Sequence, residues 1–269
     1  IYEIRGFWEI SAMANDMDYK STELFTLSRK YESQTMSMAR RILAINKGIK
    51  DKLIEINKEL NNVDVVPFET CSLDIYGTIS KIDINIKNKN IVFGYFGQLN
   101  TYEGIYPFVK ELHTLIKNGT NQFKFMIVGN GTEYQAIIQY ITINNLQPFI
   151  SIQPPVDYKQ LSILYSKIDV FCLPRINVDV CNIVLPMKLV EAIAFGKTIL
   201  ASDVDALKDI ANKYSQILLY QRDNNTDLKE KLSNLINNRN KYKIEQINQN
   251  YGSEFIKFIN NLYFQILNN

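Results

Sequence analysis

The chain has 269 residues, of which 46% are hydrophobic, and this composition excludes a disordered protein. A formal net charge of +2 gives no strong attraction to nucleic acid, and no apolar run reaches membrane-spanning length. Three cysteines without metal-ligand spacing and a single histidine argue against a zinc site, and they favour reduced thiols in the cytoplasm.

Residues 1–67 are expected to be the closing part of an α/β domain. Apolar runs and helical spacing predict three strands and two helices in the order strand 1–5, helix 20–39, strand Ile42–Ile45, helix 48–60 and strand Val63–Pro67. The chain begins inside an apolar run, with no helix before it. We therefore interpret residues 1–67 as the C-terminal remnant of a larger unit, followed by a polar linker over 68–90.

Residues 91–252 are expected to form a second α/β domain. Short apolar runs end at small or turn residues and alternate with helical segments near 104–117, 132–144, 157–167, 186–195 and 205–213. The predicted strands are Ile91–Phe96, Phe123–Val128, Phe149–Ile152, Asp169–Leu173, Thr198–Ala201 and Ile217–Tyr220. Such runs are typical of strands buried on both faces, and the alternation predicts a doubly wound parallel sheet. A last amphipathic helix is predicted at 253–267.

The segment from Pro186 to Lys197 has the strongest local pattern. Pro186 suits the first helical position, and Gly196 suits the left-handed residue after the last turn. Lys188 and Glu191 stand three residues apart and share a face. A lysine in the first turn opposes the helix dipole, and a bound anion at that end would offset the cost. The plain alternative is an amphipathic helix with a surface ion pair.

The spacing P-x-K-x-x-E-x-x-A-x-G-K resembles the donor-site helix of family-four glycosyltransferases, the retaining group 1 enzymes with the GT-B fold. The resemblance implies that the second domain binds a nucleotide-diphospho sugar and that Glu191 holds the ribose hydroxyls. It also implies that the C-terminal helix, 253–269, packs back toward the first domain. At the place of another frequent family glutamate this chain has Ile183, beside Asn182.

Two glycine-containing loops resemble the same family. Gly97 and Gln98 follow the first strand of the second domain, and Gly129 and Gly131 follow the next. In the family these loops let the backbone approach the donor diphosphate, but Gln98 and Glu103 stand where many members have Arg and Lys. A tight turn explains Gly97 equally well. The Gly129–Gly131 turn alone could suggest NAD, but Tyr134 replaces the third glycine of that fingerprint.

Two arginines are candidates for the leaving diphosphate and the sugar. Arg175 ends a strand, and a planar guanidinium matches phosphate oxygens; the alternative is a surface arginine on an exposed loop. Arg5 ends the first strand in a stretch that resembles the Y-E-V-R-G-x-W-E start of one branch of these transferases. Trp8 is either a sugar platform or a core residue. His113, at the edge of a helical apolar face, is interpreted as a structural or surface residue and not a catalytic one.

The resemblance implies a cytoplasmic enzyme of polysaccharide or glycan synthesis. It would move a hexosyl group from a nucleotide sugar to a glycan or lipid-linked acceptor, with retention, no metal and no cofactor. We expect Arg175, Lys188 and Arg5 to be the catalytic residues, and the donor site to comprise Gly97, Gln98, Gly129, Gly131, Pro186 and Glu191. No nucleic-acid partner is expected. Peripheral contact with the inner membrane surface and the oligomeric state stay open.

Two alternatives remain. A non-catalytic or truncated remnant of the fold would bind nucleotide, or only a partner, and the missing family cations at Gln98 and Glu103 favour it. A nucleotide-sugar epimerase of the same fold would need a carboxylate and a histidine at the sugar, and His113 is misplaced for that. Because the acceptor domain looks incomplete, we expect nucleotide binding from this chain, and transfer only with the missing part supplied.

Overall fold

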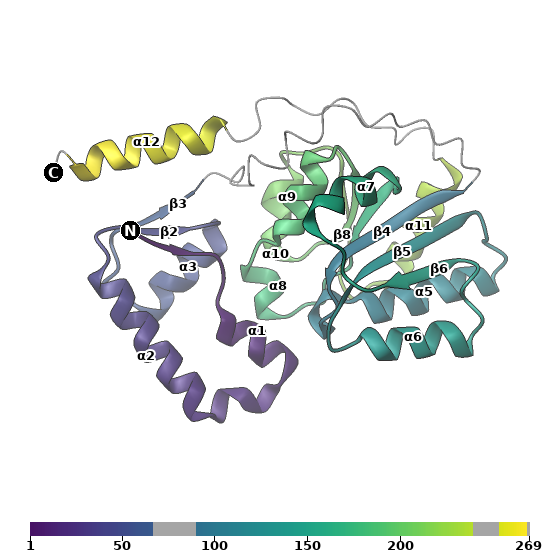
Figure 1. Cartoon of the computed structure of the whole chain (residues 1–269), viewed down its shortest axis with the longest axis horizontal. Helices are drawn as coiled ribbons and strands as arrows, with labels where there is room; N and C mark the ends of the chain where they lie inside the picture. Colours follow the sequence, from purple (N-terminus) through teal and green to yellow (C-terminus); the bar gives the residue numbers. More distant parts are fainter. Residues whose placement is uncertain (67–89, 239–252, 268–269) are drawn as a thin grey trace.

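The computed structural model describes residues 1–66, 90–238 and 253–267 (Figure 1). The predicted linker 68–90 lies outside the described residues except for its last residue. The N-terminal unit is a three-stranded parallel sheet in the order β1-β2-β3. Its elements are β1 (Tyr2–Ile4), α1 (Trp8–Asn15), η1 (Met17–Ser21), α2 (Glu23–Met38), β2 (Ile42–Ala44), α3 (Lys47–Ile56) and β3 (Val63–Val65).

The second unit is built on a six-stranded sheet in which every neighbouring pair is parallel, in the order β6-β5-β4-β7-β8-β9. The strands are β4 (Ile91–Gln98), β5 (Phe123–Asn130), β6 (Ile150–Gln153), β7 (Val170–Leu173), β8 (Thr198–Ser202) and β9 (Ile217–Tyr220). All six lie where the apolar runs predict them. The α/β, doubly wound parallel architecture is therefore confirmed.

Helices cover both faces of this sheet. Figure 1 shows α5 (Ile105–Lys117) and α6 (Tyr134–Ile143) along one face, where α11 (Asn225–Asn237) contacts α5. On the other face α7 (Leu161–Ser166) packs on α9 (Met187–Ala194) through Tyr165 and Phe195, whose ring centroids lie 4.4 Å apart. The connections also include η3 (Thr101–Glu103), η4 (Tyr158–Gln160), α8 (Asp179–Ile183) and α10 (Asp205–Ala211).

Three helices were not predicted from the sequence: α1, α8 and α11. The apolar residues of α11 recur at helical spacing and are buried, but runs of asparagine surround them. The C-terminal helix, α12 (Ser253–Leu267), has the predicted bounds, and Figure 1 draws it above the end of the molecule that carries the three-stranded sheet. Its Leu262 is only 4% exposed.

Contacts join the two units. Helix α1 contacts η3 and α8, and α3 also contacts α8. The Nδ2 of Asn46 donates to the carbonyl oxygen of Ile183 at 2.8 Å, while its Oδ1 caps α3 by accepting from Ile49 N. Gly48 allows this approach, because a Cβ there would lie 2.7 Å from the Ile183 carbonyl oxygen. The carboxyl ends of β1 and β2 therefore face the loop between α8 and α9.

Candidate functional site

The order in which the chain adds strands to the large sheet reverses between β4 and β7. From β4 the chain adds β5 and β6 on one side, and then returns to add β7, β8 and β9 on the other. Open parallel sheets bind ligands at such a reversal, outside the carboxyl ends of the strands. The loops after β4 and β7 carry Glu103 and Arg175, so the candidate site lies at the reversal.

The predicted glycines allow close approach of backbones at this edge. Gly97 has φ +149°, and Gly129 lies beside it, because a Cβ on Gly129 would be 1.8 Å from the Gly97 carbonyl oxygen. Gly131 has φ +157°, and its Cβ would come within 2.6 Å of the Leu99 backbone. Gly97 and Gly129 thus lie inside the ends of β4 and β5, not in loops after them as expected, and packing between these strand ends and the turns that follow alone explains the glycines.

Helix α9 begins one residue later than predicted. Pro186 is the extended N-cap residue, with φ −76° and ψ 130°, and Met187 opens the helix. The predicted end is confirmed, because Gly196 adopts φ +62° and its N–H donates to the Ile193 carbonyl oxygen at 2.9 Å. Lys188 therefore lies in the first turn of α9 and points to the carboxyl end of β4.

A buried ion cluster lies between these elements. Lys188 Nζ is 2.8 Å from Glu103 Oε1 and 2.8 Å from the Tyr95 hydroxyl oxygen. Glu103 Oε2 is 3.6 Å from Arg175 Nε. The Lys188 ammonium also lies against Gly97, where a Cβ would be 3.2 Å from Nζ. Two sequence-predicted residues, Arg175 and Lys188, thus meet through Glu103, and Gly97 packs against Lys188. Sequence reasoning had noted Glu103 only as a missing family cation.

The charged groups of this cluster shift one another's pKa values. Burial opposes ionisation of the Glu103 carboxyl, but Lys188 and Arg175 outweigh it, so the pKa of Glu103 lies below its usual value. Burial lowers the pKa of the Lys188 ammonium, and Glu103 offsets only part of that effect. The two residues therefore form an ionised pair in which the carboxylate stabilises the buried ammonium.

Arg175 is not on an exposed loop, so the surface alternative is wrong. Its side chain is 3% exposed, and Nη1 donates to the Val184 carbonyl oxygen at 2.8 Å. The Ser202 hydroxyl donates to the Arg175 carbonyl oxygen at 2.6 Å. Among the described residues its Nε has no hydrogen-bond partner. Arg175 thus anchors the α8–α9 loop and adds a second positive charge behind Lys188.

Glu191 lies on α9, three residues after Lys188. The Tyr165 hydroxyl is 3.5 Å from Glu191 Oε2 and 3.4 Å from the Lys188 carbonyl oxygen. Burial raises the pKa of the Glu191 carboxyl to about 6, and nearby Lys188 and Tyr165 only partly oppose it. A half-buried carboxylate with such weak partners can accept hydrogen bonds from a ligand's hydroxyl groups.

The structure does not bring every predicted residue to this cluster. Gln98 ends β4 with an exposed side chain, and its carbonyl oxygen accepts from the Tyr95 hydroxyl at 2.5 Å. Arg5 has a side chain that is 70% exposed, and its Nε lies 2.9 Å from Glu3 Oε1. Contacts within the described ranges do not link Arg5 to Lys188. Trp8 is 46% exposed and stacks edge-on against Tyr19, so it is not a core residue.

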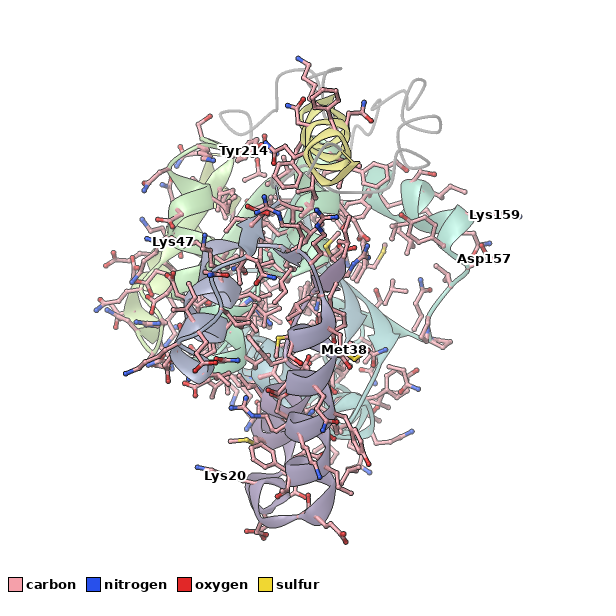
Figure 2. All side chains as sticks on the ribbon, turned by 90° about the vertical axis from the view of Figure 1, so that its left-hand side faces the viewer. Lys20, Met38, Lys47, Asp157, Lys159 and Tyr214 are labelled. Atoms are coloured by element: carbon pink, nitrogen blue, oxygen red, sulfur yellow. The ribbon has the colours of Figure 1, made fainter. Side chains whose placement is uncertain are left out.

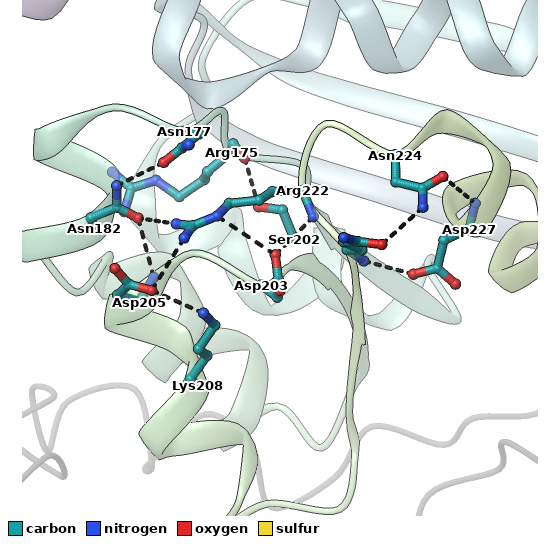
Figure 3. A network of polar contacts seen from close by, with 11 residues as sticks. Arg175, Asn177, Asn182, Ser202, Asp203, Asp205, Lys208, Arg222, Asn224 and Asp227 are labelled. Atoms are coloured by element: carbon teal, nitrogen blue, oxygen red, sulfur yellow. Dashed lines mark hydrogen bonds and ion pairs between the residues drawn. The ribbon is translucent and has the colours of Figure 1, made fainter.

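Sequence reasoning missed a second polar network at the ends of β8 and β9 (Figure 3). Arg222 Nη1 donates to Asn182 Oδ1 at 2.6 Å, and its other nitrogens lie within 4.0 Å of Asp203 and Asp205. An arginine two residues after the end of a strand was the available signal, as it was for Arg175. Because two carboxylates surround Arg222, its role here is to hold α8 and α10 to the sheet.

Two other expectations concern residues outside the site. His113 is buried in α5, and its Nδ1 lies 2.9 Å from the Tyr140 hydroxyl on α6, which agrees with a structural role. Cys172 and Cys181 are buried free thiols, and Cys71 lies outside the described residues. In the described ranges there is no cluster of three or more histidine, cysteine or acidic residues that could hold a metal.

None of the described helices combines the length and apolarity that a membrane crossing requires. In sequence, residues 78–251 match the family model described as Glycosyl transferases group 1. A glycosyltransferase of Methanocaldococcus jannaschii, itself described as uncharacterized, is 26% identical over 208 residues, which are 77% of this chain and 55% of that protein. The chain thus spans about half the length of this curated relative.

Solved structures share the fold. Sucrose-phosphate synthase from Thermosynechococcus elongatus superposes with a TM-score of 0.74 at 14% identity, over 98% of this chain and 67% of that one. The Anabaena protein HepE, solved with UDP and glucose, gives a TM-score of 0.70 at 15% identity, over 99% of this chain and 70% of that one. These likenesses support a GT-B fold. Because the family model covers well over half of its residues, this chain belongs to the glycosyl transferases of group 1.

Proposed function

We propose that this chain is the donor-binding part of a retaining glycosyltransferase that uses a nucleotide-diphospho sugar. The observation that carries the proposal is the position of α9 at the reversal of the large sheet. Its first turn presents Lys188 to Gly97 at the carboxyl end of β4, and Glu191 follows on the next turn. A diphosphate at this helix N-terminus would meet amide donors and a cation, and a ribose would meet Glu191.

The site would assist transfer by stabilising the negative charge that forms on the leaving diphosphate. When the glycosidic bond breaks, the leaving diphosphate gains negative charge, and fixed positive groups that face it lower the barrier. Lys188 is the nearest side chain for that task, with Arg175 behind it. Since these groups supply positive charge, we propose that transfer needs no divalent metal and no cofactor. Activity that survives a metal chelator, and NMR of the product anomer, test metal independence and retention.

The first experiment is titration of the chain with UDP, the nucleotide held by HepE, followed calorimetrically. Glu191→Ala should weaken binding by about 1–3 kcal/mol, the cost of a lost charged hydrogen bond. Glu111→Ala is the matched control, because it removes a carboxylate of α5 that pairs with Lys229. A large loss of thermal stability with unchanged UDP affinity would instead make Glu191 a structural residue.

The alternatives give different results. A non-catalytic remnant would bind UDP but would neither hydrolyse nor transfer a sugar from a UDP-sugar. An epimerase would change the sugar's configuration, and it would need an acid–base pair at the sugar. His113, buried between α5 and α6, is unsuited to that role. We propose that transfer to a glycan or lipid-linked acceptor requires residues beyond this chain, so this chain should bind the nucleotide and only a longer protein should transfer the sugar.

A further inference from the structure

A carboxylate occupies the middle of the cation cluster. Glu103 is 4% exposed, and its two oxygens face Lys188 Nζ at 2.8 Å and Arg175 Nε at 3.6 Å. Glu103 Oε2 and Arg175 Nε have no hydrogen-bond partner within the described part of the chain. Both cations that could meet a phosphate group therefore already face an internal anion.

The loop that carries Glu103 is held firmly. The Tyr102 carbonyl oxygen accepts from Ile176 N at 3.1 Å and from the Cys181 thiol at 3.3 Å. Gly104 has φ +72°, and a Cβ there would lie 1.9 Å from the Pro174 carbonyl oxygen. Glu103, between these two anchored residues, is thus a fixed part of the site.

The net charge of the cluster determines how strongly it can attract a diphosphate. Lys188 and Arg175 together carry two positive charges, and Glu103 removes one, so one net positive charge remains. A diphosphate ester carries two negative charges, so its approach also brings like charges close to the Glu103 carboxylate. In a poorly hydrated environment the repulsion between like charges is far stronger than in water.

We propose that Glu103 is a specificity-determining residue that acts as an internal counter-ion and weakens the binding of phosphate groups at this site. It keeps two buried cations paired in the absence of a ligand, and an arriving phosphate must share Lys188 with it. The proposal rests on the proposed function for the identity of the donor, while the competition between Glu103 and an anion does not depend on it.

The test compares the wild-type chain with Glu103→Gln, which keeps the shape of the side chain and removes its charge. Inorganic pyrophosphate is titrated calorimetrically at fixed ionic strength. The variant should bind pyrophosphate at least about tenfold more tightly, because Lys188 and Arg175 lose their internal partner. Glu111→Gln removes a carboxylate that pairs with Lys229 at 3.1 Å on another face, and it should leave the affinity unchanged. An unchanged or weakened affinity in a folded Glu103→Gln protein overturns the proposal.

A second variant covers the case in which Glu103→Gln does not fold. Glu103→Asp keeps the charge but is one methylene shorter, so its carboxylate reaches Lys188 less well, and it should give a smaller gain of about threefold. A folded Asp variant without any gain also contradicts the counter-ion role.

Titrations of both proteins with UDP and with uridine distinguish a failure of this inference from a failure of the proposed function. If Glu103→Gln binds UDP more tightly than the wild type and uridine equally, both ideas stand. If pyrophosphate binding tightens while neither protein binds UDP, the counter-ion role stands and the nucleotide-sugar function fails. If UDP binds equally well to both proteins and pyrophosphate shows no gain, the function stands and the counter-ion role fails.

Discussion

Glu191 differs from Glu103 in that no ion pair is recorded for it among the described residues, although Lys188 is near enough to lower its pKa in part. Lys188 is paired with Glu103, and Tyr165 approaches Glu191 only at 3.5 Å. Burial raises the pKa of Glu191 from 4.5 to about 6, so near neutral pH the folded chain holds a carboxylate that it stabilises poorly. Such tension between stability and charge is common where a side chain is positioned for a ligand.

Glu191→Gln should therefore change the pH dependence of stability. A group with a raised folded pKa contributes stability that is fully present below pH 4.5 and is lost as the pH rises through about 6. The glutamine variant lacks this loss. Its free energy of unfolding should match the wild type at pH 4.5 and exceed it by on the order of 1–2 kcal/mol at pH 7.5. Urea unfolding at the two pH values measures the difference, and a difference that does not vary with pH contradicts the interpretation.

At the residue scale, the sequence predicted the residues at the periphery of the ion cluster but not Glu103, the residue that links its two cations. Lys188, Gly97 and Arg175 were predicted because each has a recognisable position, in a first turn, at a strand end or after a strand. The link between them, Glu103, was not predicted. Its role depends on three segments that are distant in sequence and meet only in the folded chain, and no local pattern in the sequence reports such a meeting.

At the scale of elements, the strands of the large sheet were predictable because each is a short, mainly apolar run, and β7 and β8 are buried on both faces. The short helix α8 was not, since its five residues give too little periodicity. Yet α8 contacts both α1 and α3 of the other unit, beside the contact between α1 and η3. The Ile183 carbonyl oxygen, at the end of α8, is the acceptor that Asn46 reaches.

Gly48→Ala tests this contact. In most exposed helices the change would stabilise, because alanine has the higher helix propensity. Here the new Cβ would lie 2.7 Å from the Ile183 carbonyl oxygen, so the change should destabilise by about 1–3 kcal/mol or open the contact. Thermal unfolding and hydrogen exchange of the α8–α9 loop measure the two outcomes.

Gly6→Ala is the matched control for that substitution. Its Cβ would meet Val184 side-chain carbons at 3.5 and 3.8 Å, which is ordinary van der Waals contact at the same boundary between the units. This variant should keep its stability within about 0.5 kcal/mol. If both variants lose stability equally, crowding at Ile183 is not the cause of the loss.

At the scale of the whole molecule, the two units differ in how much of their stability can come from contacts within the unit. The large sheet has six strands with helices on both faces, and its strands β7 and β8 are buried along their whole length. The small sheet has three strands of three residues each. Its long helix α2 exposes Leu24, Tyr31 and Met38, the last of which is labelled in Figure 2 and is 87% exposed.

We therefore expect the two units to behave differently when expressed separately. Residues 90–238 should unfold cooperatively, because their sheet and both helical layers remain. Residues 1–66 should be poorly soluble or unfolded, because they lose the α8 and η3 surfaces that contact α1 and α3. Their sheet is also small and has β1 as an edge strand, which can pair with another chain. Circular dichroism with thermal melting of both fragments and the full chain makes the comparison. A cooperative melt of residues 1–66 alone would show that the small unit is an independent domain, and its contacts with α8 would then contribute little to its stability.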